Sequence, residues 1–387
     1  MLKKTVIIAS MLSICVLCIS KKQLSYTNED IDIQIANIMK DYSAIGLSVV
    51  VVKNGRIVFQ KAYGYNPDYS DESKRKPIKS NNLFYIASVS KTFVGTAIMQ
   101  LVERGKLSLD DDVNNYLDFS VRNPNFPNVP ITIRMLLCHH SSLKKDMDYD
   151  SFDKLLTKAN ENNKFFYNNY QPGSALSYSN LGYVILGAVI EKVSGLRFDR
   201  YINKNILRPL KLYGSYNMAD LDSNRFVRTY WYNPNDAKFI KQFTTYSNNQ
   251  AMMEHYVLGY STPAFRPADG MVISSGDLAK YMIMHINKGK NGHKKRILKE
   301  KSEDTMWQKN GKTVHGFSFF HSSNLIPGND MIGMTGGARG IHSIMFFQPE
   351  KKFGFVVICN GCAAKSADGS EMNKLIIREL YNTFVKY

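Results

Sequence analysis

The chain has 387 residues, of which 44% are hydrophobic and 21% are charged, and its formal net charge is +17 at pH 7. This composition is typical of a globular protein and excludes a disordered or collagen-like chain. The length suffices for one large domain or two closely packed ones. The positive charge favours anionic partners, although solvated surface lysines explain it equally well. No DNA- or RNA-binding motif is present, so nucleic acid is not an expected partner.

The first 20 residues differ from the rest of the chain. Lys3 and Lys4 precede an uncharged run over residues 5–20. This pattern predicts a secretory signal peptide or an N-terminal membrane anchor, because the run is short for a membrane span. Cys18 is a candidate for lipid attachment, although Leu17 is not the small residue usual before a lipidated cysteine. We therefore expect an exported protein, periplasmic or extracellular, whose basic surface can meet an anionic envelope polymer.

Three cysteines remain beyond this segment, namely Cys138, Cys359 and Cys362. Cys359 and Cys362 form a C-x-x-C motif directly after the apolar run 355–358. No second pair and no histidine cluster accompany the motif, so a zinc or redox role is not expected. The sequence predicts two cysteines at a strand end and leaves open whether a disulfide joins them.

The N-terminal part of the mature chain predicts a helix followed by a hairpin. Residues 31–41 favour a short helix, and the β-branched run 47–52 leads through Asn54 and Gly55 into residues 57–59. Asn-Gly between two apolar runs is a strong hairpin signal.

Beyond the hairpin, apolar positions recur at helical spacing from Phe93 to Val102, and Gly105 is placed to end that helix. Residues 107–222 alternate short helices with loops, and β-like runs gather toward the C-terminus. The expected helices are 131–137, 181–193, 276–287 and 372–384, and the expected strands are 314–320, 342–347 and 353–358. Strands at both ends of the chain around a helical middle indicate one antiparallel sheet that both ends build.

Ser88 and Lys91 carry the clearest chemical signal. Residues i and i+3 share one helix face, so Lys91 is within reach of the Ser88 hydroxyl. A serine becomes a good nucleophile only when a neighbouring base takes its proton, and a lysine held away from water can serve as that base. Ser88 also lies at the start of a helix, where free backbone amides favour negative charge on oxygen.

Two further motifs follow in the chain. Tyr178, Ser179 and Asn180 precede the helix 181–193, and Met334, Thr335, Gly336 and Gly337 precede the strand 342–347. The three motifs, in this order, resemble the serine hydrolases of the penicillin-binding-protein and class C β-lactamase family, which carry S-x-x-K, Y-x-N and then K-T-G or H-T-G. The resemblance extends over most of the mature chain, through residues 45–49, 105–117, 131–143, 172–183 and 267–278.

The resemblance implies an α/β fold, with an antiparallel sheet flanked by helices and an inserted all-helical subdomain. The hydrolase domain would span residues 24–387. Its α/β part would comprise residues 24–95 and 270–387, and the helical insertion residues 96–269.

The resemblance also implies the roles of the site residues. Ser88 would be the acylated nucleophile, Lys91 its proton acceptor, and Tyr178 a proton shuttle. Asn180 would hold the substrate amide and help to orient Lys91, and it can also cap the following helix.

On the strand side, backbone N–H groups of Ser88 and Gly337 would form the oxyanion hole, and Thr335 and Gly336 would line the strand along which substrate lies. His139 also matches a family position, where we expect a buried, hydrogen-bonded histidine. No G-x-S-x-G motif occurs, so a Ser-His-Asp hydrolase is not expected. No H-E-x-x-H motif occurs either, and neither a metal nor another cofactor is expected.

The chain departs from the family at the positions expected to bind a charged group of the substrate. Met334 stands where the family has Lys or His, and a thioether cannot hold a substrate carboxylate. Arg339 replaces a common proline five residues on, and we interpret it as a displaced anchor for a carboxylate or phosphate. Asp269 stands in place of a family glycine.

These observations favour an exported serine hydrolase that acts through an acyl-enzyme on D-alanyl or other D-amino-acid peptide or ester bonds of the cell envelope. The alternatives are a β-lactamase and a penicillin-binding sensor that is acylated without turnover. The expected partner is a small-molecule or peptidoglycan-type substrate, and the expected state is a monomer.

Overall fold

The computed structural model describes residues 28–66, 76–145, 147, 149–153, 163–242, 253–292, 295–311, 313–338, 340–363 and 370–386. The predicted signal or anchor over residues 1–20 and the predicted anion anchor Arg339 lie outside these residues. Within the described part, no helix is long and apolar enough to cross a membrane.

A seven-stranded sheet forms the centre of the α/β part, in the order β3-β2-β1-β12-β11-β10-β9. The N-terminal strand β1 (Gly46–Lys53) pairs antiparallel with the C-terminal strand β12 (Phe353–Cys359), so both ends of the chain build one sheet as predicted. Asn54 and Gly55 both have positive φ and close the β1–β2 hairpin. The other strands are β2 (Arg56–Asn66), β3 (Lys76–Pro77), β9 (Phe320–Ser322), β10 (Met331–Ala338) and β11 (Ile341–Gln348).

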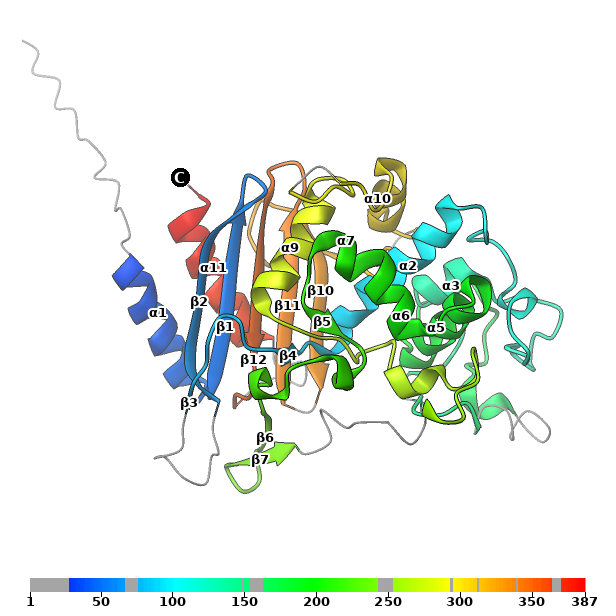
Figure 1. Cartoon of the computed structure of the whole chain (residues 1–387), viewed down its shortest axis with the longest axis horizontal. Coiled ribbons are helices and arrows are strands. Elements are labelled where there is room, and N and C mark those ends of the chain that lie inside the picture. The colour runs from blue at the N-terminus through cyan, green and yellow to red at the C-terminus, as the bar shows by residue number, and fades with distance from the viewer. Residues whose placement is uncertain are drawn as a thin grey trace, which may run out of the picture.

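Each face of the sheet is covered by helices because β1 is apolar on both sides. Leu47, Val49 and Val51 pack with helices α1 (Asn28–Asp41) and α11 (Glu371–Phe384) in one core. Val50 and Val52 point to the opposite face and belong to a second core, and there α9 (Ser275–Ile286) packs on β1, β11 and β12. Figure 1 shows α1 and α11 on one side of the sheet and the remaining helices on the other.

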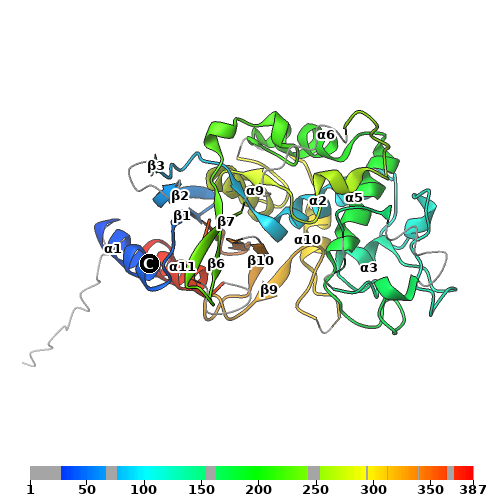
Figure 2. The same cartoon turned by 90° about the horizontal axis from the view of Figure 1, so that it is seen from below.

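The second core continues into a helical body beside the sheet (Figure 2). Its centre is α2 (Lys91–Glu103), in which residues 91–101 are all buried, and which packs against α5 (Asn180–Ser194). A helix buried on every side is expected for an apolar sequence that fills the junction between two layers. The other helices are α3 (Ile133–Leu137), α6 (Phe198–Ile202), a π-turn (Asn203–Leu207), α7 (Arg208–Leu210) and α10 (Glu300–Trp307).

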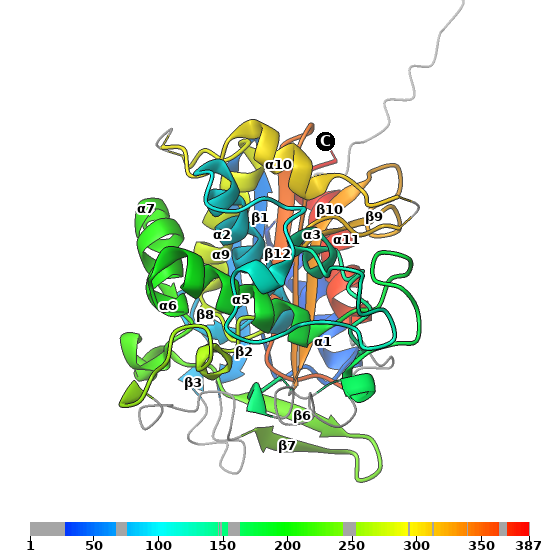
Figure 3. The ribbon, with the colours of Figure 1, turned by 90° about the vertical axis from the view of Figure 1, so that its right-hand side faces the viewer.

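The middle of the chain is not purely helical, in contrast to the prediction for residues 96–269. The hairpin β6 (Thr229–Asn233) and β7 (Lys238–Gln242) lies beyond one end of the main sheet (Figure 3). The short strand β5 (Gly214–Ser215) pairs with β8 (Val272–Ile273), which also pairs with β4 (Phe84–Tyr85). These strands are short or exposed, so they lack the apolar alternation that makes a strand visible in a sequence.

The prediction of a strand over residues 314–320 is wrong, because regular strand structure begins only at Phe320. Ser318 adopts φ 65°, which interrupts an extended backbone. Near the other end of the sheet, Cys359 ends β12 as predicted, and both Cys359 and Cys362 are buried free thiols.

Candidate active site

Ser88 lies in a tight turn that joins strand β4 to helix α2. The turn is a 3₁₀ helix over Ala87–Ser90, and α2 begins at Lys91. Ser88 itself is only partly buried, whereas Ala87, Val89 and Ser90 are buried. The turn therefore presents the Ser88 hydroxyl to the surface on an otherwise buried segment.

The backbone of this turn is strained and is held from several sides. Ala87 has φ 45°, a conformation that costs a residue with a side chain about 1–3 kcal/mol. Ser343 Oγ donates to the Ile86 carbonyl at 2.7 Å, and Tyr216 Oη donates to the Ser90 carbonyl at 2.7 Å. These bonds to residues distant in the sequence fix the position of the Ser88 turn.

Lys91 is fully buried, and its ammonium group has three hydrogen-bond acceptors. Nζ lies 2.9 Å from Ser88 Oγ, 2.7 Å from Asn180 Oδ1 and 2.9 Å from the Ala268 carbonyl oxygen. A buried amine without such partners would be strongly unfavourable. The structure thus brings the predicted nucleophile, the predicted base and the predicted orienting amide into direct contact.

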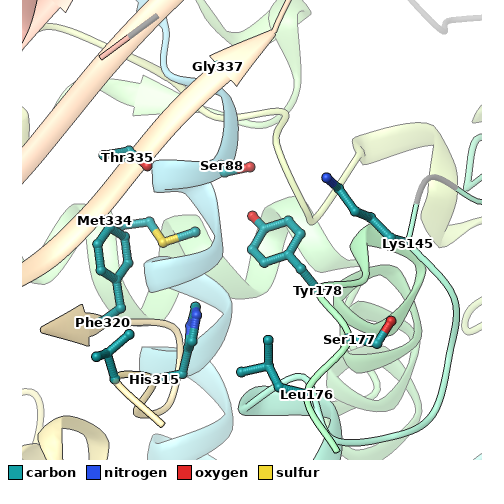
Figure 4. Close-up of a pocket in the computed structure, with 11 residues that line it drawn as sticks. Ser88, Lys145, Leu176, Ser177, Tyr178, His315, Phe320, Met334, Thr335 and Gly337 are labelled. Carbon is teal, nitrogen blue, oxygen red and sulfur yellow. The ribbon is translucent and has the colours of Figure 1, made fainter. Parts of the chain in front are cut away.

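Tyr178 lies against the same lysine. Nζ of Lys91 is 4.9 Å from the centre of the Tyr178 ring, and Figure 4 shows the Tyr178 hydroxyl directed toward Ser88. The His139 ring packs against the Tyr178 ring, with 4.2 Å between the two ring centroids. His139 Nδ1 accepts a hydrogen bond from Ser179 N at 3.1 Å. His139 is therefore the buried, hydrogen-bonded histidine expected from the sequence, and it positions the tyrosine.

Asn180 is the first residue of α5, and the helix cap expected of it belongs to its neighbour. Ser179 Oγ accepts from Gly182 N at 3.3 Å, which leaves the Asn180 side chain for Lys91. The cap and the lysine contact would compete for one side chain, and adjacent residues divide the two tasks.

Strand β10 passes beside the Ser88 turn on the opposite side of the site. A Cβ atom on Gly336 would lie 2.4 Å from the Ile86 carbonyl oxygen and 3.0 Å from Ser88 N, so only glycine allows this approach. Gly337 is the next residue of β10, and it pairs with His342 of β11. Gly337, Thr335 and Met334 all line the same cavity as Ser88. The oxyanion hole implied by the sequence resemblance is thus compatible with this arrangement.

The cavity at Ser88 has a volume of about 790 Å³. Figure 4 shows Met334, Phe320 and His315 on one side, Leu176 and Ser177 on the other, and Lys145 extending beside Tyr178. Among the described residues, Lys145, Leu176, Ser177, Val314, His315 and Phe320 are lining residues that the sequence motifs did not identify. Except for Phe320, which begins β9, they stand on loops, and no residue pattern marks them.

The buried carboxylate of Asp269 organises the loop that supports Lys91. Asp269 accepts hydrogen bonds from Tyr85 Oη at 2.5 Å and Tyr149 Oη at 3.0 Å, and it forms a 2.7 Å ion pair with Arg266. Burial by itself would raise the pKa of Asp269, but Arg266 and the hydrogen bonds hold that pKa below its ordinary value. The departure from the family glycine therefore places a charged group next to Ala268, whose carbonyl accepts from Lys91.

An antiparallel sheet closed by both chain ends, with a Ser–Lys pair on a buried helix at its edge, defines a serine hydrolase. A comparison with family models agrees, because the model described as Beta-lactamase matches residues 31–376. The chain belongs to the Beta-lactamase family.

Individual proteins resemble this chain at sequence identities of 25% or less in the three examples that follow. Protein flp of Staphylococcus aureus (strain MRSA252) is 25% identical over 334 residues, which are 81% of this chain and 59% of the relative, so the chain spans about three fifths of that protein. An octameric penicillin-binding protein homologue from Pyrococcus abyssi superposes with TM-score 0.71 at 24% identity, over 91% of this chain and 76% of that chain. The D-amino acid amidase from Ochrobactrum anthropi SV3 superposes with TM-score 0.67 at 20% identity, over 92% and 99%. At these identities, the two structures establish the fold.

Gly336→Ala tests the close approach of β10 to the serine turn. We expect kcat/KM for any turned-over ester to fall by about 100-fold or more, because the added Cβ displaces the Ser88 backbone amide from its position in an oxyanion hole. Gly292→Ala is the matched control, since a Cβ there meets nothing within 4 Å. Wild-type kinetics in Gly336→Ala would contradict the placement.

His139 makes the stability of the fold dependent on pH. Burial, and then the charge of Lys91, lower the pKa of His139 well below its ordinary value of 6.5, so the folded state holds it neutral. The unfolded chain binds a proton at His139 below about pH 6.5. The contribution of His139 to the free energy of unfolding is therefore fully present above pH 6.5 and decreases as the pH falls below it.

We expect His139→Gln to flatten this dependence between pH 7 and pH 5 in urea unfolding, at some loss of stability at pH 7. His255→Gln is the control on the same chain. An unchanged slope in His139→Gln would rule out His139 as its source.

Proposed function

We propose that the protein is a serine hydrolase that forms an acyl-enzyme on Ser88 and cleaves D-alanyl or other D-amino-acid peptide or ester bonds of cell-envelope substrates. The observation that carries this proposal is the 2.9 Å contact between Lys91 Nζ and Ser88 Oγ, inside a buried site that Asn180 completes. The amidase and the penicillin-binding protein among the similar structures support the substrate class.

In acylation, Ser88 Oγ attacks the substrate carbonyl carbon and passes its proton to Nζ of Lys91. This step requires a neutral Lys91, whose two N–H bonds go to Asn180 and Ala268 and whose lone pair then faces Ser88. The carbonyl oxygen becomes negative and accepts hydrogen bonds from the backbone amides of Ser88 and Gly337. Each such donor is typically worth about 10²–10³ in rate.

The leaving group then departs with a proton. Tyr178, whose hydroxyl faces Ser88, delivers that proton to the leaving nitrogen or oxygen. Tyr178 then takes up the proton that Lys91 received from Ser88. In deacylation, a water molecule gives its proton to the same groups and attacks the ester carbon, and Ser88 regains its hydroxyl proton when the acid is released.

The proposed location is the cell envelope, and it depends on the basic and apolar segment over residues 1–20. Cleavage of this segment and lipidation of Cys18 are alternatives that lead to the same compartment. The high positive charge suits a surface rich in anionic polymer.

A second candidate is a penicillin-binding sensor that stalls as an acyl-enzyme, and a β-lactamase is a third. Met334 favours the sensor over the β-lactamase, because this side chain lines the cavity at Ser88 where a cation would hold the penicillin carboxylate. All three candidates share acylation of Ser88 and differ in whether water releases the acyl group.

A time course of intact mass with excess benzylpenicillin separates these candidates. The full-length chain is compared with Ser88→Ala and with Ser174→Ala, an exposed serine, as the matched control. We expect an adduct of one penicillin per chain that is absent in Ser88→Ala and present in Ser174→Ala. In parallel, release of D-alanine from an N-acylated D-Ala-D-Ala peptide reports the proposed activity.

An adduct together with D-alanine release supports the proposed hydrolase, whereas an adduct without any turnover identifies the sensor. Hydrolysed penicillin without an accumulating adduct identifies the β-lactamase. Equal acylation of Ser88→Ala and the wild type would show that the serine assignment is wrong.

Arg339→Ala tests the proposed anchor at residue 339. If this guanidinium holds a substrate carboxylate, we expect KM for an anionic substrate to rise several-fold with little change for a neutral one. Arg228→Ala, a change of another arginine, is the control. An unchanged KM for the anionic substrate would contradict this role for Arg339.

A further inference from the structure

The cavity at Ser88 has one strongly apolar wall. Met334 and Phe320 form it on the side of β10. Val314 and Leu176 also line the cavity and are 50% and 38% exposed, so two aliphatic side chains of the lining are open to solvent. A substrate with an apolar group next to its reactive carbonyl would cover both side chains and remove them from water.

The charges around this cavity are of one sign. Among its described lining residues, none is acidic, whereas Lys145 is basic and exposed. His315 also lines the cavity, but burial, and then His140, lower the pKa of its imidazole, so it presents a neutral ring near pH 7. Within the described lining, the cavity therefore offers a positive charge to a substrate and no carboxylate to pair with a substrate ammonium group.

Lys145 extends its amine toward the opening beside Tyr178 (Figure 4). None of the ion pairs between described residues involves Lys145. Its neighbour Lys144 is placed differently, since the Lys144 amine lies 5.7 Å from the centre of the Phe165 ring and outside the cavity lining. Two adjacent lysines thus provide a test residue and a matched control.

We propose that this cavity selects acyl donors with an apolar side group and an anionic N-acyl substituent, whose carboxylate pairs with Lys145, and that it rejects a free α-ammonium group. The inference rests on the proposed hydrolase and specifies its substrate. Met334 makes the wall near β10 apolar, and Lys145 supplies a cation from the opposite side. A free ammonium group there would lose water without gaining an anionic partner, and Lys145 would repel it.

Four p-nitrophenyl esters test this selectivity on the full-length chain. Three are derived from D-phenylalanine and carry a free amine, an N-acetyl group or an N-succinyl group, so the charge of the N-substituent changes from positive to neutral to negative around one reactive bond. The fourth, the N-acetyl-D-alanine ester, replaces the apolar side group by a methyl group. Release of p-nitrophenolate above the rate of Ser88→Ala measures acylation, even if the acyl-enzyme is slow to hydrolyse.

We expect kcat/KM to be roughly fivefold higher for the succinyl than for the acetyl ester, the size of an exposed ion pair. We expect kcat/KM for the free-amine ester to be at least about tenfold lower than for the acetyl ester. For the alanine ester, we expect kcat/KM to be roughly tenfold lower than for the N-acetyl-D-phenylalanine ester. Lys145→Gln should abolish the preference for the succinyl ester, measured as the ratio of kcat/KM for the succinyl and acetyl esters. Lys145→Glu should reverse it, and Lys144→Gln should retain it.

Fastest acylation by the free amine, or a succinyl preference that survives in Lys145→Gln, would overturn this inference and leave the hydrolase intact. A preference for the alanine ester would overturn its apolar part. Rates with all four esters equal to those of Ser88→Ala would overturn the proposed hydrolase and this selectivity with it.

Discussion

The burial of one amine, Lys91, is the constraint on which the rest of the site depends. A fully buried lysine is tolerable only when its N–H bonds find acceptors. Here the acceptors come from three separate segments: the turn before α2, the first turn of α5, and the loop before β8. Because each acceptor must reach the same nitrogen, the helical body and the sheet meet at α2, and Ser88 is presented at that junction.

Each of these segments has its own support. Arg266, Tyr85 and Tyr149 hold Asp269, and this network fixes the loop whose Ala268 carbonyl faces Lys91. Glu191, buried on α5, accepts hydrogen bonds from Gly259 N and Thr262 Oγ1. These bonds hold the segment that precedes Ala268 against α5. Preorganisation of this kind is what allows a static arrangement of donors to stabilise a developing charge.

The chemistry and the specificity of the site have separate structural origins. The proposed reacting groups stand on the turn before α2 and on α2 itself, at the start of α5 and on strand β10, which are held by the two cores. The cavity walls come from loops around Lys145, Leu176 and Val314, which pack less tightly. Loops can change sequence at little cost to stability, so one catalytic arrangement can serve different substrates. Met334 is an exception, since it changes the charge of the wall from within the strand.

The sequence could predict the elements whose signals are local. Ser88 and Lys91 meet because three residues nearly complete a helical turn, and the Asn54–Gly55 hairpin follows from backbone sterics. The strand runs at both chain ends also predicted a shared antiparallel sheet, which β1 and β12 form. Local signals failed for the hairpin β6–β7, for α10, whose sequence is mostly charged, and for residues 314–319, where the backbone at Ser318 departs from a strand.

By itself, then, the sequence determined the order of the motifs and predicted which groups react, because side-chain chemistry and short spacing suffice for both. Only the tertiary structure decided that Ser179 rather than Asn180 caps α5, that Asp269 joins a buried network beside Lys91, and that Lys145 stands at the cavity. The cap bond of α5 is itself local, but the lysine that occupies the Asn180 side chain comes from 89 residues earlier in the chain. The Asp269 network and the cavity likewise join residues that are distant in the chain. The packing of whole elements determines such contacts, and no local pattern of residues encodes them.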